Sequence, residues 1–140
     1  MDDAATQQIY EYGRQGREAW QRGDLSAAER RFLQAWSLLP EPRTGHGLAQ
    51  SMATALVKFY RDSGRYDQAE RWLHVARQAY GSDPASDAHL GFLRGTVCFE
   101  SGDFDAALEA FGTLYATYGK RPFQGEDGKY LDWLRRSTRR

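Results

Sequence analysis

Residues 23–40 have the sequence GDLSAAERRFLQAWSLLP, in which both the start and the end of a helix are marked. Gly23 can adopt the left-handed backbone of a tight turn, and Asp24 can accept hydrogen bonds from the free N–H groups of a new helix. Pro40 stops the helix after about four turns. The apolar residues between these signals recur at steps of three and four, which is the spacing of one helix face; they are Ala28, Phe32, Ala35 and Leu39.

The same pattern occurs twice more in the chain. It returns as GRYDQAERWLHVARQAY at residues 64–80 and as GDFDAALEAFGTLYATY at residues 102–118. Other segments also show helical spacing of apolar residues or helix start signals. No segment alternates between apolar and polar residues with a period of two, so we expect no strands. The expected helices are residues 2–22, 23–39, 48–62, 66–80, 88–100, 104–118 and 129–136. Gly13 and Gly16 lie inside the first of them, where each costs roughly 1 kcal/mol relative to alanine and so requires a packing reason.

Length and composition limit the class of protein. A chain of 140 residues predicts one domain, residues 1–140. Its 19 basic and 19 acidic residues give a formal net charge of zero, which argues against nucleic acid or an anionic membrane as partner. The sequence has neither a long apolar run nor a secretory signal, so we expect a cytoplasmic protein. Cys98 is the only cysteine, which excludes an internal disulfide and a multi-cysteine metal site.

The three hairpins resemble tetratricopeptide repeats, whose unit is a helix, a short turn and a second helix with small and aromatic residues at fixed places. In the first copy Gly16 matches the family's first-helix glycine, and Ala28, Phe32, Ala35 and Pro40 match its second helix. The resemblance implies an all-α solenoid of about seven helices, with repeats at about residues 9–40, 50–81 and 88–119 and a capping segment at 120–140. The other two copies match in part, at Leu56, Tyr60, Gly64, Tyr66, Ala69 and Ala76 and at Gly95, Gly102, Phe104, Ala107 and Phe111.

The spacing of the repeats departs from the family. Gly23 to Gly64 is 41 residues and Gly64 to Gly102 is 38, where the family has about 34. We expect the extra residues, near 41–47 and 81–86, to lengthen the connections or the flanking helices. After the third hairpin, Phe123 either packs back onto it or belongs to a contact loop. The apolar residues expected to cap that hairpin are Tyr130, Leu131, Trp133 and Leu134.

No catalytic or metal-binding pattern is evident in the sequence. His46, His74 and His89 stand far apart and form no metal-ligand spacing, and there is no phosphate-binding glycine loop or nucleophile motif. Cys98 takes a tyrosine place of the repeat, so we interpret it as a small buried residue rather than a nucleophile. We therefore expect no enzymatic activity, no cofactor and no metal.

The resemblance implies a concave surface formed by the first helix of every hairpin. In the consecutive repeats Arg17 and Lys58 hold equivalent places, which indicates a basic centre suited to an acidic or carboxylate-bearing segment with an apolar anchor. Scattered cations that merely solvate a helix face remain the alternative. The predicted contact residues are Tyr10, Arg14, Arg17, Trp20, Gln21, Thr54, Lys58, Arg61, His89, Phe92, Thr96 and Phe99, and Ser51, Asp62 and Glu100 lie on the same projected face.

We expect a small adaptor or chaperone-like module, a monomer or weak dimer, that binds a peptide or protein. An immunity protein that sequesters a toxin is one alternative, and a scaffold that self-assembles through exposed aromatics such as Trp36 or Trp72 is another. The chain has no asparagine, so the family's carboxylate clamp for chaperone C-termini, which uses asparagine and lysine, is not carried over. The basic C-terminal residues suit a solvated helix end better than a nucleic-acid site.

Overall fold

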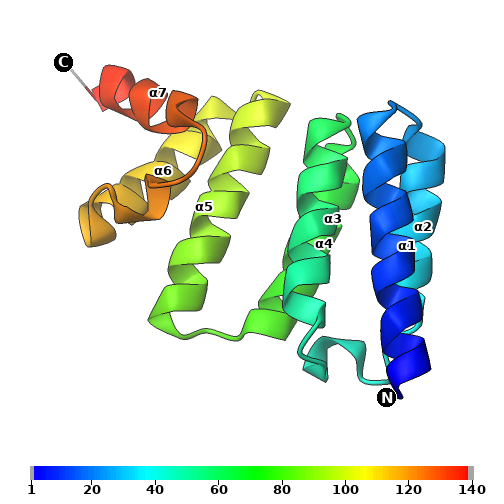
Figure 1. The fold of residues 1–140 in the computed structure, drawn as a ribbon. Helices are drawn as coiled ribbons and strands as arrows, with labels where there is room; N and C mark the ends of the chain where they lie inside the picture. The colour runs from blue at the N-terminus through cyan, green and yellow to red at the C-terminus, as the bar shows by residue number, and fades with distance from the viewer. Residues whose placement is uncertain (1, 139–140) are drawn as a thin grey trace.

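The computed structural model describes residues 2–138, in which seven α-helices form three antiparallel hairpins and one C-terminal helix (Figure 1). The expected all-α fold of consecutive hairpins is confirmed. Two short 3-10 turns, η1 (Arg43–Gly45) and η2 (Arg121–Phe123), lie in the connections after the first and third hairpins. The helices are α1 (Asp3–Gln21), α2 (Leu25–Ser37), α3 (Ala49–Asp62), α4 (Tyr66–Tyr80), α5 (Pro84–Ser101), α6 (Phe104–Tyr118) and α7 (Gly128–Thr138).

The three hairpins close with the same turn. Its glycine has a left-handed backbone each time, with φ of +81° at Gly23, +77° at Gly64 and +87° at Gly102. The N–H of the residue after the glycine donates to the carbonyl five residues earlier, over 2.8–2.9 Å in all three copies. This is the Schellman arrangement, which satisfies carbonyls that a helix end would otherwise leave free. Residues at matching positions in the three copies therefore form the same backbone structure.

Two hairpins are closed by a glycine that faces an aromatic ring. At Gly16 of α1, an added Cβ would lie 2.6 Å from the ring of Phe32 on α2. Gly95 of α5 lies against Phe111 of α6 in the same way, and an added Cβ would again overlap the ring. Both phenylalanines are buried, so the small residue lets the helices approach and the ring fills the adjacent space. The packing reason required for Gly16 is thus found.

The longer repeat spacing has two different structural outcomes. Between the first and second hairpins the extra residues lengthen the connection, which contains η1. Between the second and third they lengthen α5, which has 18 residues against 14 in α3. Its helix starts at Pro84, four residues before the expected start, because the Asp83 side chain accepts from the N–H of Ser86 and Pro84 occupies the first turn.

The C-terminal segment covers the third hairpin. Phe123 is buried, with its ring centre 5.4 Å from that of Phe92 and 5.5 Å from that of Phe111, so the packing alternative for Phe123 is confirmed. Tyr130 and Leu134 of α7 are also buried in this cluster. As expected, α7 caps the last hairpin.

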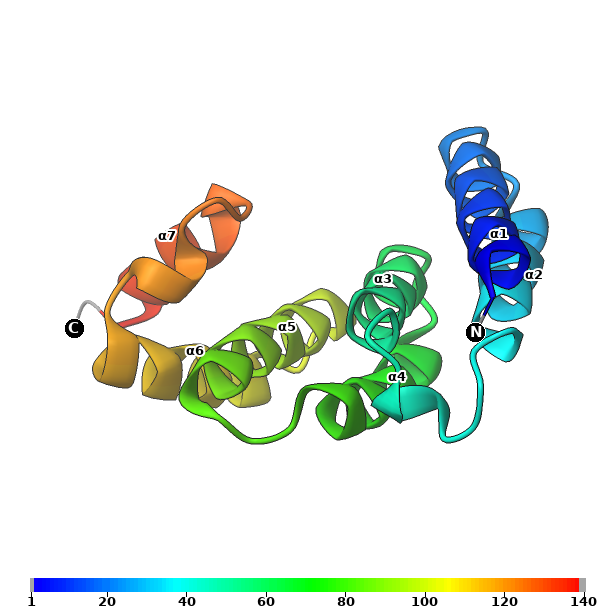
Figure 2. The same cartoon turned by 60° about the horizontal axis from the view of Figure 1, so that its bottom comes forward.

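The stacked hairpins form a curved array. Figure 2 shows α1, α3 and α5 along the inner side of the curve and α2, α4 and α6 along the outer side, with α7 rising at one end. Trp36 of α2 and Trp72 of α4 lie edge to face, with ring centres 5.0 Å apart. Both are half-buried, so these tryptophans pair within one chain and are not the exposed aromatics that we expected to be available for pairing two copies.

Candidate functional site

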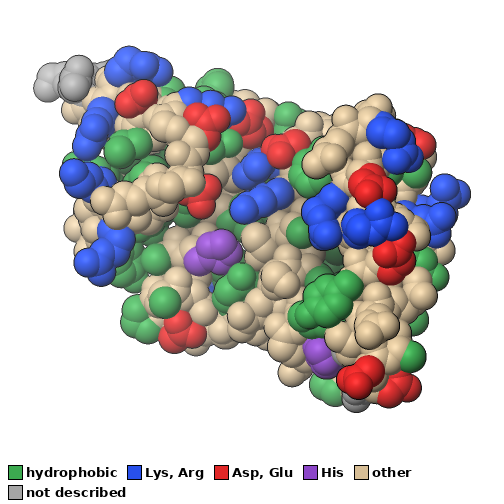
Figure 3. All heavy atoms as spheres, in the orientation of Figure 1, with side chains coloured by type: hydrophobic (Ala, Val, Ile, Leu, Met, Phe, Trp, Pro, Cys, Tyr) green, Lys and Arg blue, Asp and Glu red, His purple; other side chains and the backbone are tan. Residues whose placement is uncertain are grey.

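The candidate site is the concave face, formed by α1, α3 and α5. Figure 3 views the molecule onto this face and shows Lys and Arg side chains over the C-terminal halves of α1 and α3, interspersed with carboxylates. All three helices run in the same direction, so residues at equivalent repeat positions lie in rows across the face (Figure 1). The predicted contact residues differ in their solvent exposure and in whether their charges are paired.

Two cations of this face, Arg17 and Lys58, have no carboxylate partner in the part of the chain that the structure describes. Among residues 2–138, no carboxylate oxygen lies within 4.0 Å of the Arg17 or Lys58 side-chain nitrogens. Arg17 is exposed and Lys58 is half-buried. Arg14, by contrast, forms ion pairs with Glu11 and Glu18 along α1. Arg17 and Lys58 are therefore the cations of the predicted set that can bind an external carboxylate without first breaking an ion pair.

Arg61 connects two hairpins and has little freedom. Its Nη1 donates to the hydroxyl of Thr96 on α5 over 2.9 Å, and its Nε donates to the carboxylate of Asp62 over 2.8 Å. Only 13% of the Arg61 side chain is exposed. Its contacts are those of a structural residue that holds α3 to α5.

Three predicted contact residues are buried, which corrects their expected exposure. Thr54, Phe92 and Thr96 are 8%, 6% and 0% exposed. Phe92 faces the rings of Phe123 and Tyr130, because the C-terminal segment covers this part of α5. A partner on the concave face cannot reach these three side chains in this conformation.

Trp20 and Phe99 are half-buried and form aromatic packing between elements. The Trp20 ring lies edge to face with Phe59 of α3, with ring centres 5.3 Å apart, and so fills the space between α1 and α3 at the C-terminal end of α1. Phe99 lies 5.2 Å from the ring of Trp133 on α7. Each has a packing role, and only part of its surface is open to a partner.

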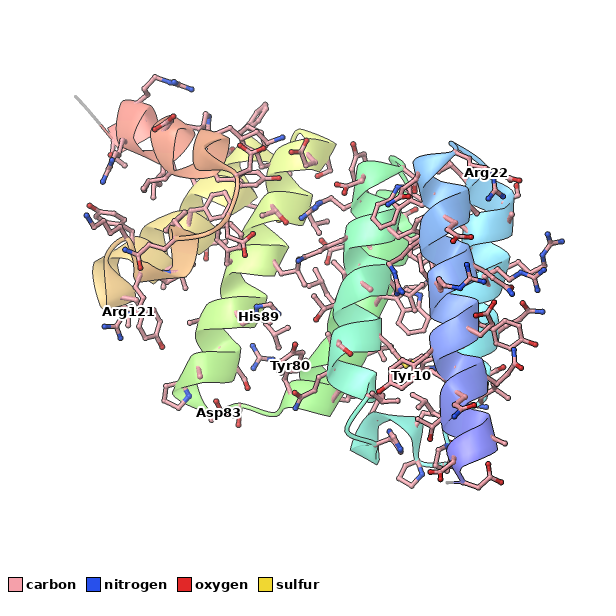
Figure 4. The ribbon with its side chains drawn as sticks, in the orientation of Figure 1. Tyr10, Arg22, Tyr80, Asp83, His89 and Arg121 are labelled. Carbon is pink, nitrogen blue, oxygen red and sulfur yellow. The ribbon has the colours of Figure 1, made fainter. Side chains whose placement is uncertain are left out.

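His89 lies between the second and third hairpins (Figure 4). Its ring centre is 5.1 Å from that of Tyr80, whose hydroxyl is 3.3 Å from that of Thr54. The Nε2 atom is buried and has no hydrogen-bond partner within residues 2–138. Burial, assisted by the charge of Lys58 and opposed by Glu126, lowers the pKa of His89 below its ordinary value. His89 is thus favoured in its neutral form.

An apolar cleft of about 210 Å³ opens between α1 and α3. Tyr10 stands at its rim, is 60% exposed and extends from α1 on the side of α3 (Figure 4). Arg17 and Ser51 also line it, whereas Gln21 is exposed beyond it. The sequence prediction did not include the remaining lining residues, which are Ile9, Gly13, Phe32, Ala35, Leu48, Met52, Ala55 and Leu56.

A second depression, between α3, α5 and the start of α7, is polar. Glu100 accepts from the Tyr130 hydroxyl over 2.9 Å and pairs with Lys129 over 2.6 Å. Arg61 and its partner Asp62 also line it, and so do Lys58, Glu126 and Asp127. Most of these charges are paired within the chain, so fewer charged groups of this depression are free to bind a ligand than around Arg17.

Two features of the described chain concern metal binding and the cysteine thiol. Within residues 2–138, no three His, Cys, Asp or Glu side chains are placed to hold a metal ion. Burial raises the pKa of the Cys98 thiol, the only thiol of the chain, so the thiol form is favoured.

No helix within residues 2–138 is both long and apolar enough to cross a bilayer.

Comparisons of the chain with protein-family models, curated proteins and solved structures find no match.

Proposed function

We propose that the chain is a divergent module of the tetratricopeptide-repeat type that binds an acidic segment of another protein on its concave face. The three identical hairpin turns and the glycine-to-ring contacts in two hairpins support the assignment to that repeat type. The curvature of the array supports binding on the inner side, since first helices line it throughout (Figure 2).

Two cations, Arg17 and Lys58, carry the proposal, because neither has an ion-pair partner among residues 2–138. Most charged side chains near them are neutralised within the chain, as in the ion pairs of Arg14 and Arg61. An Arg guanidinium can bind a carboxylate through two parallel hydrogen bonds, and a Lys ammonium adds a point charge. A partner with carboxylates at matching spacing would thus find two cations that lose no internal ion pair on binding.

The proposal is tested with peptides rather than with an unknown natural partner. Random 12-residue peptides displayed on phage are selected on the immobilised protein, and the dissociation constants of enriched peptides are measured by fluorescence anisotropy. We expect the enriched peptides to be acidic. The double variant Arg17→Glu, Lys58→Glu should bind them at least tenfold more weakly, because a charge-assisted hydrogen bond contributes about 1.5–3 kcal/mol.

The matched control reverses two charges on the outer helices. Arg30 of α2 and Arg71 of α4 are exposed and, among residues 2–138, form no ion pair. Arg30→Glu, Arg71→Glu makes the same change in net charge and should leave the affinity within about twofold. These residues lie away from the concave face, so they alter only the long-range electrostatic attraction, which salt screens. Equal weakening in the two double variants, or none in the inner one, would contradict the concave-face proposal.

A further inference from the structure

The cleft between α1 and α3 has the composition of a side-chain binding site. Its floor consists of buried apolar residues, with Phe32 8%, Ala35 3% and Leu56 2% exposed. Its rim holds Tyr10, the most exposed large hydrophobic residue in residues 2–138. A concave apolar surface with few polar groups at its edge is the usual form of a ligand pocket.

Gly13 leaves this cleft open. Toward the C-terminal end of α1, Trp20 fills the space between α1 and α3, but Gly13, two turns earlier, has no side chain to do so. An added Cβ at Gly13 would meet only Nη1 of Arg17, at 3.3 Å, whereas at Gly16 it would overlap a buried ring. Gly16 is therefore explained by packing, and Gly13 is not. A helical glycine that costs stability and has no packing reason is accounted for if it keeps a binding space free.

The position of Arg17 supplies the charge. Because its Nη1 lies over Gly13, the guanidinium folds back along α1 to the cleft, which it also lines. In residues 2–138 no carboxylate neutralises it. A group that enters the cleft therefore comes next to a free positive charge, which complements a carboxylate.

The size of the cleft limits its occupant. An apolar cavity of about 150 Å³ is known to hold benzene, so about 210 Å³ has room for one leucine or phenylalanine side chain. We propose that the cleft binds one large apolar side chain of the partner, which carries an Asp or Glu side chain in the same short segment for Arg17. This inference rests on the proposed function and names the anchor of the segment that the concave face binds.

The test uses three matched dipeptides as probes: N-acetyl-Phe-Glu-amide, N-acetyl-Phe-Gln-amide and N-acetyl-Ala-Glu-amide. They are titrated to millimolar concentration into the full-length ¹⁵N-labelled protein, and amide chemical shifts are followed by NMR. We expect the Phe-Glu probe to bind at least threefold more tightly than either of the others. The shifts should centre on the amides of Gly13 and Ala55, on the two walls of the cleft.

The decisive variant is Gly13→Leu, which fills the cleft from α1. It should bind the Phe-Glu probe at least tenfold more weakly than the unaltered protein. Gly112→Leu is the matched control, because Gly112 is also helical and has no atom within 4 Å of an added Cβ. Gly112→Leu should bind the probe as the unaltered protein does. Circular dichroism of both variants should show unchanged helix content, which separates loss of binding from loss of fold.

Three results would overturn the inference. If Gly13→Leu keeps full affinity while Arg17→Glu, Lys58→Glu loses it, the concave face binds acidic ligands but the cleft is not the anchor site. If neither variant affects probe binding, the proposed function and the anchor both fail. If the probes do not bind and Gly13→Leu instead converts a dimer to a monomer in sedimentation, the cleft holds a second copy of the chain.

Discussion

Gly13→Ala and Gly16→Ala form a matched pair of substitutions in the same helix, three residues apart. Both replace a helical glycine by alanine, which stabilises a helix by about 1 kcal/mol. At Gly13 the new methyl group meets only the flexible tip of Arg17, so that gain is kept. At Gly16 it would lie 2.6, 2.7 and 3.1 Å from three atoms of the Phe32 ring. Overpacking of this kind costs about 1–3 kcal/mol.

The Phe32 ring has little room to move away from Gly16. It is 8% exposed, and its centre lies 6.2 Å from that of Trp20 and 5.4 Å from that of Phe59. The helix-propensity contributions of the two substitutions cancel, so the difference in unfolding free energy between the variants is the overpacking cost. Gly16→Ala should be about 1–3 kcal/mol less stable than Gly13→Ala, which corresponds to a melting temperature lower by about 3 °C or more.

The assay is urea denaturation followed by circular dichroism at 222 nm, with thermal melts as a second measurement. The third hairpin provides a replicate, because Gly95 faces the Phe111 ring as Gly16 faces Phe32, and Gly112 is open as Gly13 is. Equal or greater stability of Gly16→Ala relative to Gly13→Ala would refute the reasoning. It would mean that the ring relocates at no cost and that close approach of the helices does not require glycine.

Two further predictions concern pH and a hydrogen bond between hairpins. Because burial and a nearby lysine lower the pKa of His89, the unfolded chain binds a proton below about pH 6.5 that the folded chain resists, so stability falls as the pH drops below that value. His89→Gln should reduce this loss in urea titrations at pH 7.5 and 5.5, whereas the exposed His74→Gln should not; an unchanged loss in His89→Gln would contradict the assignment. Tyr60 donates to Glu29 over 2.7 Å, so Tyr60→Phe should cost about 1.5 kcal/mol at pH 7. Partial burial raises the pKa of Glu29, but the hydrogen bonds from Arg65 and Tyr60 outweigh burial, so the net shift is downward. The loss of stability caused by Tyr60→Phe should therefore shrink as the pH falls below 4.5 and Glu29 is protonated. A loss of stability that is constant with pH would count against this hydrogen bond.

Local sequence signals predicted the hairpins well, because they depend on residues close in the chain. Asp24 accepts a hydrogen bond from a helix N-terminus as expected, and Gly23 has the expected left-handed turn. Several helix boundaries differ from the expected ones: α2 ends at Ser37, with Leu38 as its cap, two residues before the expected end, and α5 starts four residues early. Helix ends fray, and Pro40 restricts the residues before it, so boundaries are the less predictable part of a helix.

The concave face was predicted less well, because its accessibility depends on a segment outside the repeats. The repeat pattern places Phe92 and Thr96 on the inner side of α5. In the structure Phe123 and Tyr130 pack against Phe92, and Arg61 of α3 donates to the Thr96 hydroxyl. The sequence of α5 does indicate this burial, since apolar residues on more than one face of a helix are typical of a helix buried on several sides.

The cleft was missed for a different reason. Most of its lining residues are ordinary core residues in the sequence pattern, such as Ile9, Phe32 and Leu56, and the absence of a side chain leaves it open. In the sequence, Gly13 and Gly16 are equally helical glycines that require a packing reason. Only the structure separates Gly13 from Gly16, because the contact that distinguishes them lies on another helix.

The three hairpin turns have a consequence for chirality. Gly23, Gly64 and Gly102 have positive φ, and no atom lies within 4 Å of an added Cβ at any of them. An L-residue there is strained by about 1–2 kcal/mol through its own backbone alone. The mirror-image residue, D-alanine, prefers this same positive φ. In a chemically synthesised chain, D-alanine at each turn should restrict the unfolded state without backbone strain in the folded one, adding about 0.4–1 kcal/mol per turn. At the hairpin turns, achiral glycine therefore occupies positions whose backbone conformation is the one that a D-residue prefers.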